Sequence, residues 1–526
     1  MSRLKAAHKR DPRLVVLIVP AILAACGDGP NRLSSGGDPP RDSTAVTILY
    51  PANDLGPSAS APIQYLVFLT LAQRNPSGDL EGRLARDWAI AEDGRGWTVY
   101  LRTDVRWHDG APVTTRDVKF TLDLYAHPDV LAALPGAYEV RVLDDSTYTI
   151  RYAATAKVEL PIGSPLDWYY PIYPEHLLRD EDPARFNNWE FWRRPIGNGP
   201  YRLVRRIPET ALVLEANPDF YLGPPAIPAV ILQSGGSSLV ELQAGNVDAI
   251  ASLSDSDVPM LRADDRVNLY YAFNLGSISS ILWNQKRRPL NDPRVRRALT
   301  MAIDRRAILQ LLNAPSELEP VDVLFTEHQF RDGVLPPGLA HDPDSARALL
   351  DAAGWVDGGG GLRERKSEPF RFSLLVSSGG GPWFPDHRRE AVMVQADLRE
   401  VGVDVEIIAV DASVGWERTQ IGDFDAAIFD IKGGNRPLLF GPQSMIGYQE
   451  PRAAALIGAA TREMDPGTRA TLFEELGALL REDLPFTLLQ PMVTWTAIDR
   501  RLAGLSSPWR ADPAWYLDAL WCEPLP

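Results

Sequence analysis

The carboxylate and imidazole side chains of this sequence are its candidates for general acid–base chemistry. Asp423, Asp425 and Asp430 form a dense acidic group that could hold a pair of catalytic carboxylates, but the pattern favours a solvated charged stretch. His108 directly precedes an Asp-Gly pair, and that position favours a structural histidine over a general base. These residues therefore predict no catalytic site by themselves.

Other signatures of catalysis or metal binding are missing from the sequence. It contains no G-x-S-x-G, H-E-x-x-H, P-loop, G-x-G-x-x-G or C-x-x-C motif. His341 and His387 each stand near the start of a predicted helix, where capping accounts for them. Seven histidines and two cysteines are too few and too scattered to suggest a metal centre or a disulfide framework. We therefore predict no catalytic residue, no metal site and no cofactor, and we do not expect an enzyme.

A cysteine near the N-terminus offers a different chemistry, the covalent attachment of lipid. Basic residues in 1–13 precede an uninterrupted apolar run over 14–25. That run is too short to span about 30 Å of hydrocarbon and is typical of a secretory signal peptide. Leu-Ala-Ala-Cys-Gly at 23–27 resembles a bacterial lipobox, which implies removal of residues 1–25 and acylation (palmitate among the chains) of Cys26. The alternative is a plain signal peptide that leaves Cys26 as a free thiol.

The composition predicts a globular body on a tether. The chain has 526 residues, of which 45% are hydrophobic and 23% charged, and these values exclude disordered, collagen-like and multi-span membrane proteins. The formal net charge of −15 argues against a nucleic-acid-binding surface. Residues 26–44 are rich in Gly, Ser and Pro, so we expect a lipidated flexible tether there, with the body starting at residue 45.

Helix and strand patterns follow one another along the body, which favours an α/β fold. The alternation over 97–102 predicts a half-buried strand, and Thr114 with Asp117 predicts a capping box at a helix start. Asp-Pro pairs at 292–293 and 342–343 predict the first turns of two further helices. Further predictions are helices near 387–400 and 468–482, a strand over 403–407 and a hairpin tip at 358–361.

A series of short motifs also runs in order along the body. They stand at 84–88 (Leu-Ala-Arg-Asp-Trp), 97–102, 105–113, 117–120, 195–201 (Pro-Ile-Gly-Asn-Gly-Pro-Tyr), 217–221, 242–248, 292–305, 346–355, 398–402, 423–425 and 482–485. In this order they resemble the family 5 extracellular solute-binding proteins of ABC importers, the group of the oligopeptide- and dipeptide-binding proteins. Each motif alone is weakly specific, and their order carries the resemblance. Most have structural roles, and the arginines of 294–306 are expected to be solvated or ion-paired.

The resemblance implies an α/β, two-lobed periplasmic-binding-protein-like fold (type II, the large peptide-binding-protein variety) with a hinge and an interlobe cleft. The first lobe is expected at 45–277 plus 488–526, with an inserted subdomain, and the second at 278–487. Crossings at 271–283 and 484–495 would join them. A ligand bound between the lobes would drive closure through its contacts with both. The chain is expected to be a monomer.

The ligand class is predicted less sharply than the scaffold. In peptide-binding members of the family, the strand after the F-D-x-x motif leads to a Trp and then to an Asp that pairs the α-amine of the ligand. Counted from Asp425, the matching positions here are Ile431 and Gly434, and a slip of two or three residues would let Asp430 serve. Cationic and amide side chains nearby would instead meet a carboxylate, a phosphate or a sugar hydroxyl. The candidate ligand-binding residues are Asn53, Asp54, Tyr271, Asn274, Trp383, Trp416, Lys432, Asn435 and Arg436.

The leading hypothesis is a membrane-anchored solute-binding protein of the periplasm or the outer cell surface. It would deliver a peptide or another small polar solute to the permease subunits of an ABC transporter, with no nucleic-acid partner. One alternative is a lipoprotein hydrolase that acts on surface polymers, which would need two convergent titratable groups. The other is a non-transport scaffold or sensor with the same fold. Cys522 has no predicted role.

Overall fold

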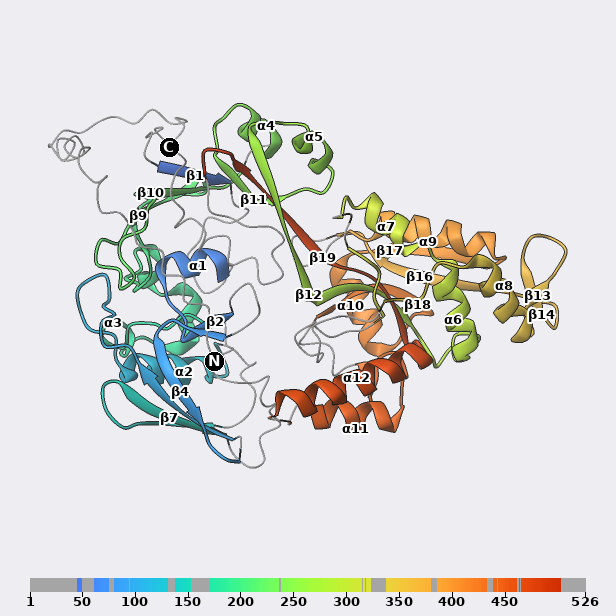
Figure 1. Ribbon diagram of the computed structural model, residues 1–526, viewed down its shortest axis with the longest axis horizontal. Helices are drawn as coiled ribbons and strands as arrows, with labels where there is room; N and C mark the ends of the chain where they lie inside the picture. Colours follow the sequence, from blue (N-terminus) through green and yellow to red (C-terminus); the bar gives the residue numbers. More distant parts are fainter. Residues whose placement is uncertain are drawn as a thin grey trace, which may run out of the picture. The chain divides into compact units, whose positions relative to one another are not determined.

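Figure 1 shows the computed structural model of the chain. The structure describes residues 45–49, 61–74, 80–93, 95–130, 138–152, 170–235, 238–314, 316, 318–322, 337–379, 386–432, 439–441, 443–460, 463 and 465–502. The predicted signal peptide, Cys26, the predicted tether and Cys522 lie outside these residues. Within them, no helix combines the length and the apolar character that a membrane span requires.

A mixed sheet of ten strands runs through both halves of the described chain, in the order β17-β16-β18-β12-β19-β11-β1-β10-β9-β8. These strands are β1 Ala45–Leu49, β8 Tyr201–Ile207, β9 Ala211–Ala216, β10 Ala229–Gln233, β11 Ala249–Leu253, β12 Val267–Trp283, β16 Arg371–Ser377, β17 Asp404–Val410, β18 Ala426–Lys432 and β19 Phe486–Asp499. Strands far apart in sequence are neighbours in this sheet, which identifies the crossovers of an α/β protein.

Smaller sheets hold the remaining strands. They are a four-stranded sheet of β4 Ala85–Ile90, β5 Gly96–Leu101, β7 Thr147–Tyr152 and β6 Tyr138–Val142, a pair of β2 Ala72–Arg74 and β3 Leu80–Gly82, and a ribbon of β13 Val356–Asp357, β14 Arg363–Arg365 and β15 Glu368–Pro369. The alternation predicted over 97–102 is confirmed in β5, where Trp97, Val99 and Leu101 are buried. The predicted hairpin tip at 358–361 joins β13 to β14.

Several of the helices begin at polar residues whose side chains cap them. They are α1 Ala61–Val67, α2 Thr115–Tyr125, α3 Glu175–Leu178, α4 Ser238–Gln243, α5 Val258–Arg262, α6 Pro293–Ala302, α7 Arg305–Leu311, α8 Pro343–Ala352, α9 Arg388–Glu400, α10 Ala412–Ile421, α11 Pro451–Ala460 and α12 Pro466–Asp483, with 3₁₀ turns η2 Pro183–Asn188 and η3 Glu190–Arg193. Thr114 and Asp117 form the predicted capping box of α2. The side chains of Asp292 and Asp342 cap α6 and α8, as predicted.

The buried side chains divide into cores that define two lobes. We call first lobe the part whose buried side chains come from residues 46–271 and 495–498, and second lobe the part whose buried side chains come from 278–489. In the second lobe, two cores lie on opposite faces of the sheet, because neighbouring strand residues such as Ile428 and Ala427 belong to different cores. The predicted lobe boundaries at 277/278 and 487/488 remain predictions.

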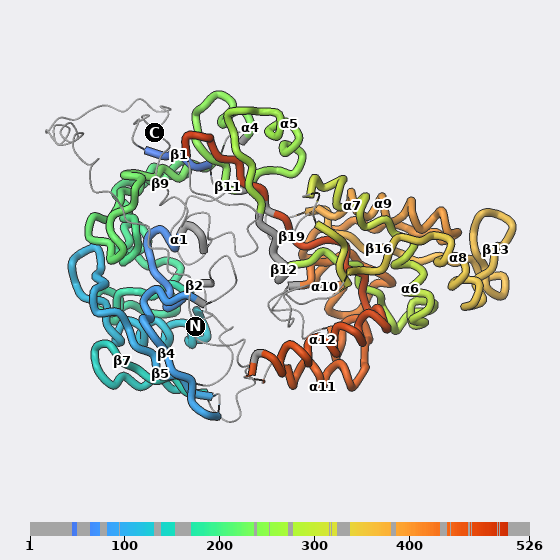
Figure 2. The backbone as a smooth tube through the Cα atoms, in the orientation of Figure 1, coloured from blue at the N-terminus to red at the C-terminus, as the bar shows by residue number. Residues whose placement is uncertain are grey.

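Two long antiparallel strands, β12 and β19, contribute to the cores of both lobes. Figure 2 shows their tubes running side by side. Their register shifts between Asn274 and Ile278 and again between Ser279 and Ser280, close to where the two lobes' cores part. The first shift leaves residues 275–277 of β12 outside the regular ladder, and the second leaves out Leu489 of β19.

Buried arginines correct one expectation from the sequence. Arg294 is exposed and paired with Asp292, as expected. Arg296 is 3% exposed, and no ion pair links it to an acidic side chain among the described residues. Its guanidinium donates hydrogen bonds to backbone carbonyls, among them that of Leu484 at 2.9 Å. Arg305 is ion-paired with Asp322, as expected, but both side chains are 2% exposed. Residues 294–306 therefore include buried arginines that make polar contacts, and not only the solvated or ion-paired arginines that the sequence suggests.

Candidate functional site

Each lobe contains three parallel strands whose carboxyl ends meet at one edge. In the first lobe β1 runs parallel to β10 and β11, and in the second lobe β16 runs parallel to β17 and β18. Ligands of open α/β sheets bind outside the carboxyl ends of parallel strands. The strands end at Leu49, Gln233 and Leu253 in the first lobe and at Ser377, Val410 and Lys432 in the second.

In the second lobe, the start of α9 lies against this edge. The backbone N–H of His387 donates to the carbonyl of Ser377 at 3.1 Å, which fixes the histidine at the carboxyl end of β16. Its ring faces two carboxylates, with Nδ1 3.1 Å from Glu390 Oε1 and Nε2 3.5 Å from Asp430 Oδ1. His387 and Glu390 are 3% and 2% exposed as residues, so water screens this group weakly. We call His387, Glu390 and Asp430 the second-lobe triad.

The charge of the second-lobe triad follows from these contacts. Burial by itself would lower the pKa of His387, but its interactions with Asp430 and Glu390 outweigh burial and raise that pKa to about 9. The imidazole is therefore a cation at neutral pH. The second-lobe triad thus places one imidazolium between two carboxyl groups.

Several oxygens around the triad have no hydrogen-bond partner among the described residues. They are Glu390 Oε2 and the hydroxyls of Ser277 and Ser279, all buried. Ser279 stands directly opposite Asp430 in the antiparallel pair of β12 and β18, so their side chains share one face of the sheet. Because a buried polar group without a partner costs free energy, this strip of oxygens is suited to receive a polar ligand.

A residue of the first lobe also contacts the start of α9. Asp255 follows β11, and one of its carboxylate oxygens lies 2.6 Å from Arg389 Nη1. The amide of Asn313 donates to the carbonyl of Asp255 at 2.8 Å. Arg389 in turn donates to the carbonyl of Leu311 at 2.8 Å, which fixes its guanidinium. The chain after a parallel strand of the first lobe is thus bonded to the helix that carries the second-lobe triad.

Two aromatic candidates from the sequence have different environments. Trp416 in α10 is half-buried and stacks on Phe429 of β18, with 5.2 Å between ring centroids and 20° between planes. Tyr271 in β12 is buried and contacts Trp495 at 5.3 Å. Tyr271 therefore belongs to the core of the first lobe, whereas Trp416 leaves part of its ring exposed.

Of the other predicted ligand-binding residues, only Asn274 and Lys432 are among those that the structure describes. Asn274 and Lys432 lie in β12 and β18, where they pair with Met492 and Ser277 along the backbone. The remaining candidates, Asn53, Asp54, Trp383, Asn435 and Arg436, lie outside the described residues. Lys432 thus belongs to the strand that carries Asp430. Trp416 packs on Phe429, whose side chain points to the opposite face of that strand from Asp430.

His387 and Glu390 are not among the ligand-binding residues predicted from the sequence, whereas Asp430 was considered there as a partner for the α-amine of the ligand. His387 was expected to cap a helix, and this expectation is wrong, because its side chain makes no cap bond to α9 and contacts Glu390 and Asp430 instead. The expectation of a solvated stretch is also wrong for Asp430, whose side chain is 11% exposed. The signal that could have found the pair is the spacing of His387 and Glu390, because residues three apart share one helix face. Among the described residues, no group of three or more His, Cys, Asp and Glu side chains is arranged to hold a metal ion.

Comparisons with known proteins agree on one family. The family model of the bacterial extracellular solute-binding proteins, family 5 Middle, matches residues 79–444, more than half of the chain. The oligopeptide-binding protein AppA of Bacillus subtilis is 24% identical over 96% of each chain. Heme-binding protein A of Haemophilus influenzae is 23% identical over 87% of each chain. The crystal structure of NikA from Brucella suis in complex with Fe(III)-EDTA, 21% identical, superposes on 88% of this chain and 97% of its own with a TM-score of 0.73.

Proposed function

The chain belongs to the bacterial extracellular solute-binding proteins of family 5, and on that basis we propose that it captures a peptide or another small polar solute outside the cytoplasm and delivers it to the permease subunits of an ABC transporter. The family is one of binding proteins rather than of enzymes, and the fold is the two-lobed α/β fold that the sequence motifs imply. An oligopeptide-binding relative that matches over nearly its whole length supports a peptide as the solute.

The observation that carries the proposal is the second-lobe triad with its unpaired oxygens. A peptide α-amine is an ammonium with three N–H donors, and it could satisfy Glu390 Oε2 and the hydroxyls of Ser277 and Ser279. The Glu390 oxygen and the two hydroxyls all accept hydrogen bonds, so they favour a ligand that donates them, such as an ammonium. We therefore propose that the free amino group of the solute binds at the triad.

Release to a permease requires a second conformation, and the long strands supply a place for it. A solute that contacts both lobes shifts an open–closed equilibrium by its differential affinity for the closed form. We propose that β12 and β19 flex at the register shifts near Asn274 and Ser279, so that the lobes close over the solute.

The sequence leaves an anionic solute as the second candidate. Lys432, Asn435 and Arg436 predict a cationic loop at the end of β18, which would receive a carboxylate, a phosphate or a sugar hydroxyl. The double substitution Lys432→Glu and Arg436→Glu should weaken the binding of an anionic solute and leave the melting temperature of the protein nearly unchanged. Unchanged affinity would remove this loop from the site.

The test of the proposed solute begins with the protein as purified. Native mass spectrometry before and after heating identifies what the protein retains. A library of tri- to pentapeptides, offered with free and with acetylated N-termini, then tests the amine requirement by retention on the immobilised protein. We expect retention of the free peptides and at least about tenfold weaker retention of the acetylated ones, because the acetyl group removes the ammonium charge.

A matched pair of variants separates the triad from general charge effects. Asp430→Asn should lower the affinity for free-amine peptides, whereas Asp423→Asn, which removes an equal charge at an exposed pair with Arg418, should not. Equal retention of free and acetylated peptides would contradict the amine contact. If neither form is retained and only a small anion co-purifies, a peptide is not the solute.

Attachment to the membrane forms a separate part of the proposal. We propose that acylated Cys26 holds the protein at the cell envelope through the tether of residues 26–44. Stable anchoring takes more than one acyl chain, and each buried methylene contributes about 0.8 kcal/mol. Cys26→Ser should therefore release the protein from membranes, and a variant that still sediments with membranes at high salt would contradict the lipid anchor.

A further inference from the structure

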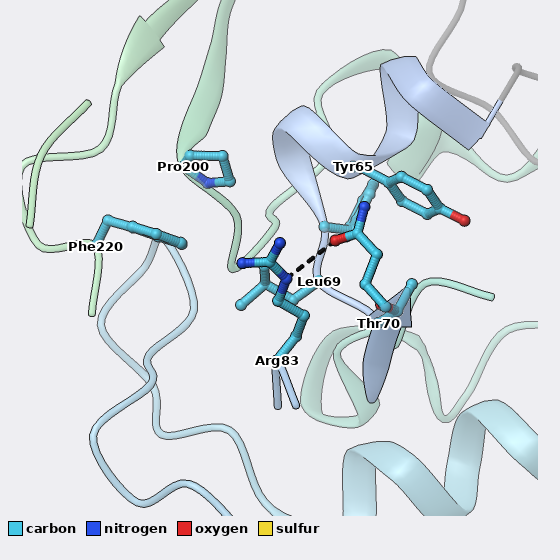
Figure 3. A pocket seen from close by; sticks show the side chains of 8 residues that line it. Tyr65, Leu69, Thr70, Arg83, Pro200 and Phe220 are labelled. Atoms are coloured by element: carbon cyan, nitrogen blue, oxygen red, sulfur yellow. Dashed lines mark hydrogen bonds between the residues drawn. The ribbon is translucent and has the colours of Figure 1, made fainter. Parts of the chain in front are cut away.

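A small pocket lies in the first lobe beside the end of α1, away from the strands that hold the second-lobe triad. Its polar lining comes from Thr70, Gln73 and Arg83, and its apolar walls include Phe68 and Phe220. Figure 3 shows Arg83 in the pocket between Phe220 and Tyr65. The cavity has a volume of about 10 Å³, which is room for a single small group.

Gln73 makes this pocket more than a packing defect. The residue is 7% exposed, and its Oε1 accepts a hydrogen bond from Arg83 Nε at 3.0 Å. That bond fixes the orientation of the amide and leaves the Nε2 donors without a partner among the described residues. An unpaired buried donor is costly, so the site favours a ligand atom that accepts a hydrogen bond.

The charges around the pocket restrict the chemical class of the ligand further. Among the described residues that line the pocket, Arg83 carries the single formal charge. The Thr70 hydroxyl already donates to the carbonyl of Ala72 at 2.8 Å, so its proton is engaged. An oxygen with negative charge meets both the Gln73 donors and the field of Arg83, whereas an ammonium would meet neither.

We propose that this pocket binds one oxygen of a carboxylate, held by Gln73 Nε2 beside Arg83. The carboxylate can belong to a free small acid or to one end of the transported solute, and in the second case the inference rests on the proposed function. The narrow space admits the oxygen and leaves the rest of the molecule outside.

Side-chain amide signals of the full-length protein test the proposal with formate as the probe. The protein is labelled with ¹⁵N-glutamine, and the Gln73 signals are assigned by their loss in Gln73→Met. Sodium formate should shift the Gln73 signals saturably, and sodium chloride at the same ionic strength should not. The exposed Gln420 provides the internal control and should respond to neither salt. A Gln73 response that is absent, unsaturable or equal for chloride would overturn the proposal and leave a water-filled pocket.

Variants of Arg83 test the charge. Arg83→Met should weaken formate binding at least about tenfold, because it removes the charge that assists the hydrogen bond. Arg83→Lys keeps that charge and should weaken formate binding less, so an equal loss in both variants would contradict a role for charge.

Competition distinguishes the two sources of the carboxylate. If the solute provides it, formate should weaken retention of the co-purifying solute, and if a free acid provides it, solute retention should be unchanged. The formate titration needs no solute, so its failure is separate from a failure of the proposed function.

Discussion

The surroundings of His108 in the first lobe, which is half-buried, and of His387 in the second lobe, which is buried, show how differently two imidazoles can be held. His108 lies at the turn that contains Gly197 and Gly199. Its Nδ1 accepts from the backbone N–H of Gly197 at 3.2 Å, and its Nε2 lies 3.0 Å from the carbonyl of Gly199. One neutral tautomer satisfies both bonds, and burial lowers the pKa of His108 to about 4. His387, between two carboxylates, has its pKa raised to about 9.

The same contrast extends to the cores around them. Among the described residues of the first lobe, Asp117 of the capping box is the single buried charged side chain, and aromatic rings such as Phe68, Tyr173 and Trp192 pack edge to face. The second lobe buries several ionisable side chains, namely Arg296, Arg305, Asp322, Arg363, His387 and Glu390. The first lobe therefore depends on apolar packing, and the second lobe depends on paired charges and on the protons that they hold.

Breaking a buried ion pair of the second lobe should have the largest effect. Arg305→Met leaves the Asp322 carboxylate buried without its cation, and we expect a loss of about 3–5 kcal/mol in the free energy of unfolding. The neighbouring Arg306→Met removes an exposed pair with Glu319 and should cost less than about 1 kcal/mol. Urea unfolding of both variants measures the difference, and equal losses would contradict the contrast between buried and exposed pairs.

Alkaline titration should test His387 next. Because its pKa is higher in the folded chain than the ordinary value of 6.5, its stabilising effect is complete below about pH 6.5 and is lost as the pH rises through 9. We expect the wild type to lose about 3 kcal/mol more than His387→Gln between pH 6 and pH 10. Unfolding curves at several pH values measure this loss, and parallel curves for the two proteins would mean that His387 is not held as a cation.

Acid titration should show the opposite sign for His108. Its pKa is lower in the folded chain than in the unfolded chain, so its stabilising effect is complete above about pH 6.5 and is lost as the pH falls toward 4. Between pH 7 and pH 5 we expect the wild type to lose about 2 kcal/mol that His108→Gln does not lose. His127→Gln, at a histidine with an exposed side chain, is the matched control and should follow the wild type.

Removing one neutral hydrogen bond from the aromatic core should have the smallest effect. The hydroxyl of Tyr125 donates to the carbonyl of Pro171 at 3.3 Å, within a cluster that includes Tyr173 and Phe186. Tyr125→Phe keeps the ring and should cost about 1 kcal/mol, independent of pH between 5 and 9. Thermal unfolding measures the cost, and a pH-dependent loss would show that the first lobe also depends on ionic contacts.

Local structure and family were readable from the sequence, because both are recorded over short spacings. The capping box at Thr114 and the helix starts at Asp292 and Asp342 depend on residues two or three apart, and all are confirmed. The fold followed from the order of the motifs, and the family model confirms it.

The candidate site was less readable, because its contacts join distant parts of the chain. His387 and Asp430 are 43 positions apart, and only the pairing of β16 with β18 brings the start of α9 toward Asp430. The burial of Arg296 likewise depends on the end of α12, where the carbonyl of Leu484 lies 188 positions away. No periodicity near either residue reports such partners.

The register shifts between β12 and β19 have a mechanical consequence. A ladder in which every residue is paired resists torsion, because twisting it strains all of its hydrogen bonds at once. The shifts at Asn274 and at Ser279 interrupt the β12–β19 ribbon at two places only a few residues apart. Torque applied to one end of the ribbon would then be absorbed over this short segment, and the paired stretches on either side would turn as stiff levers.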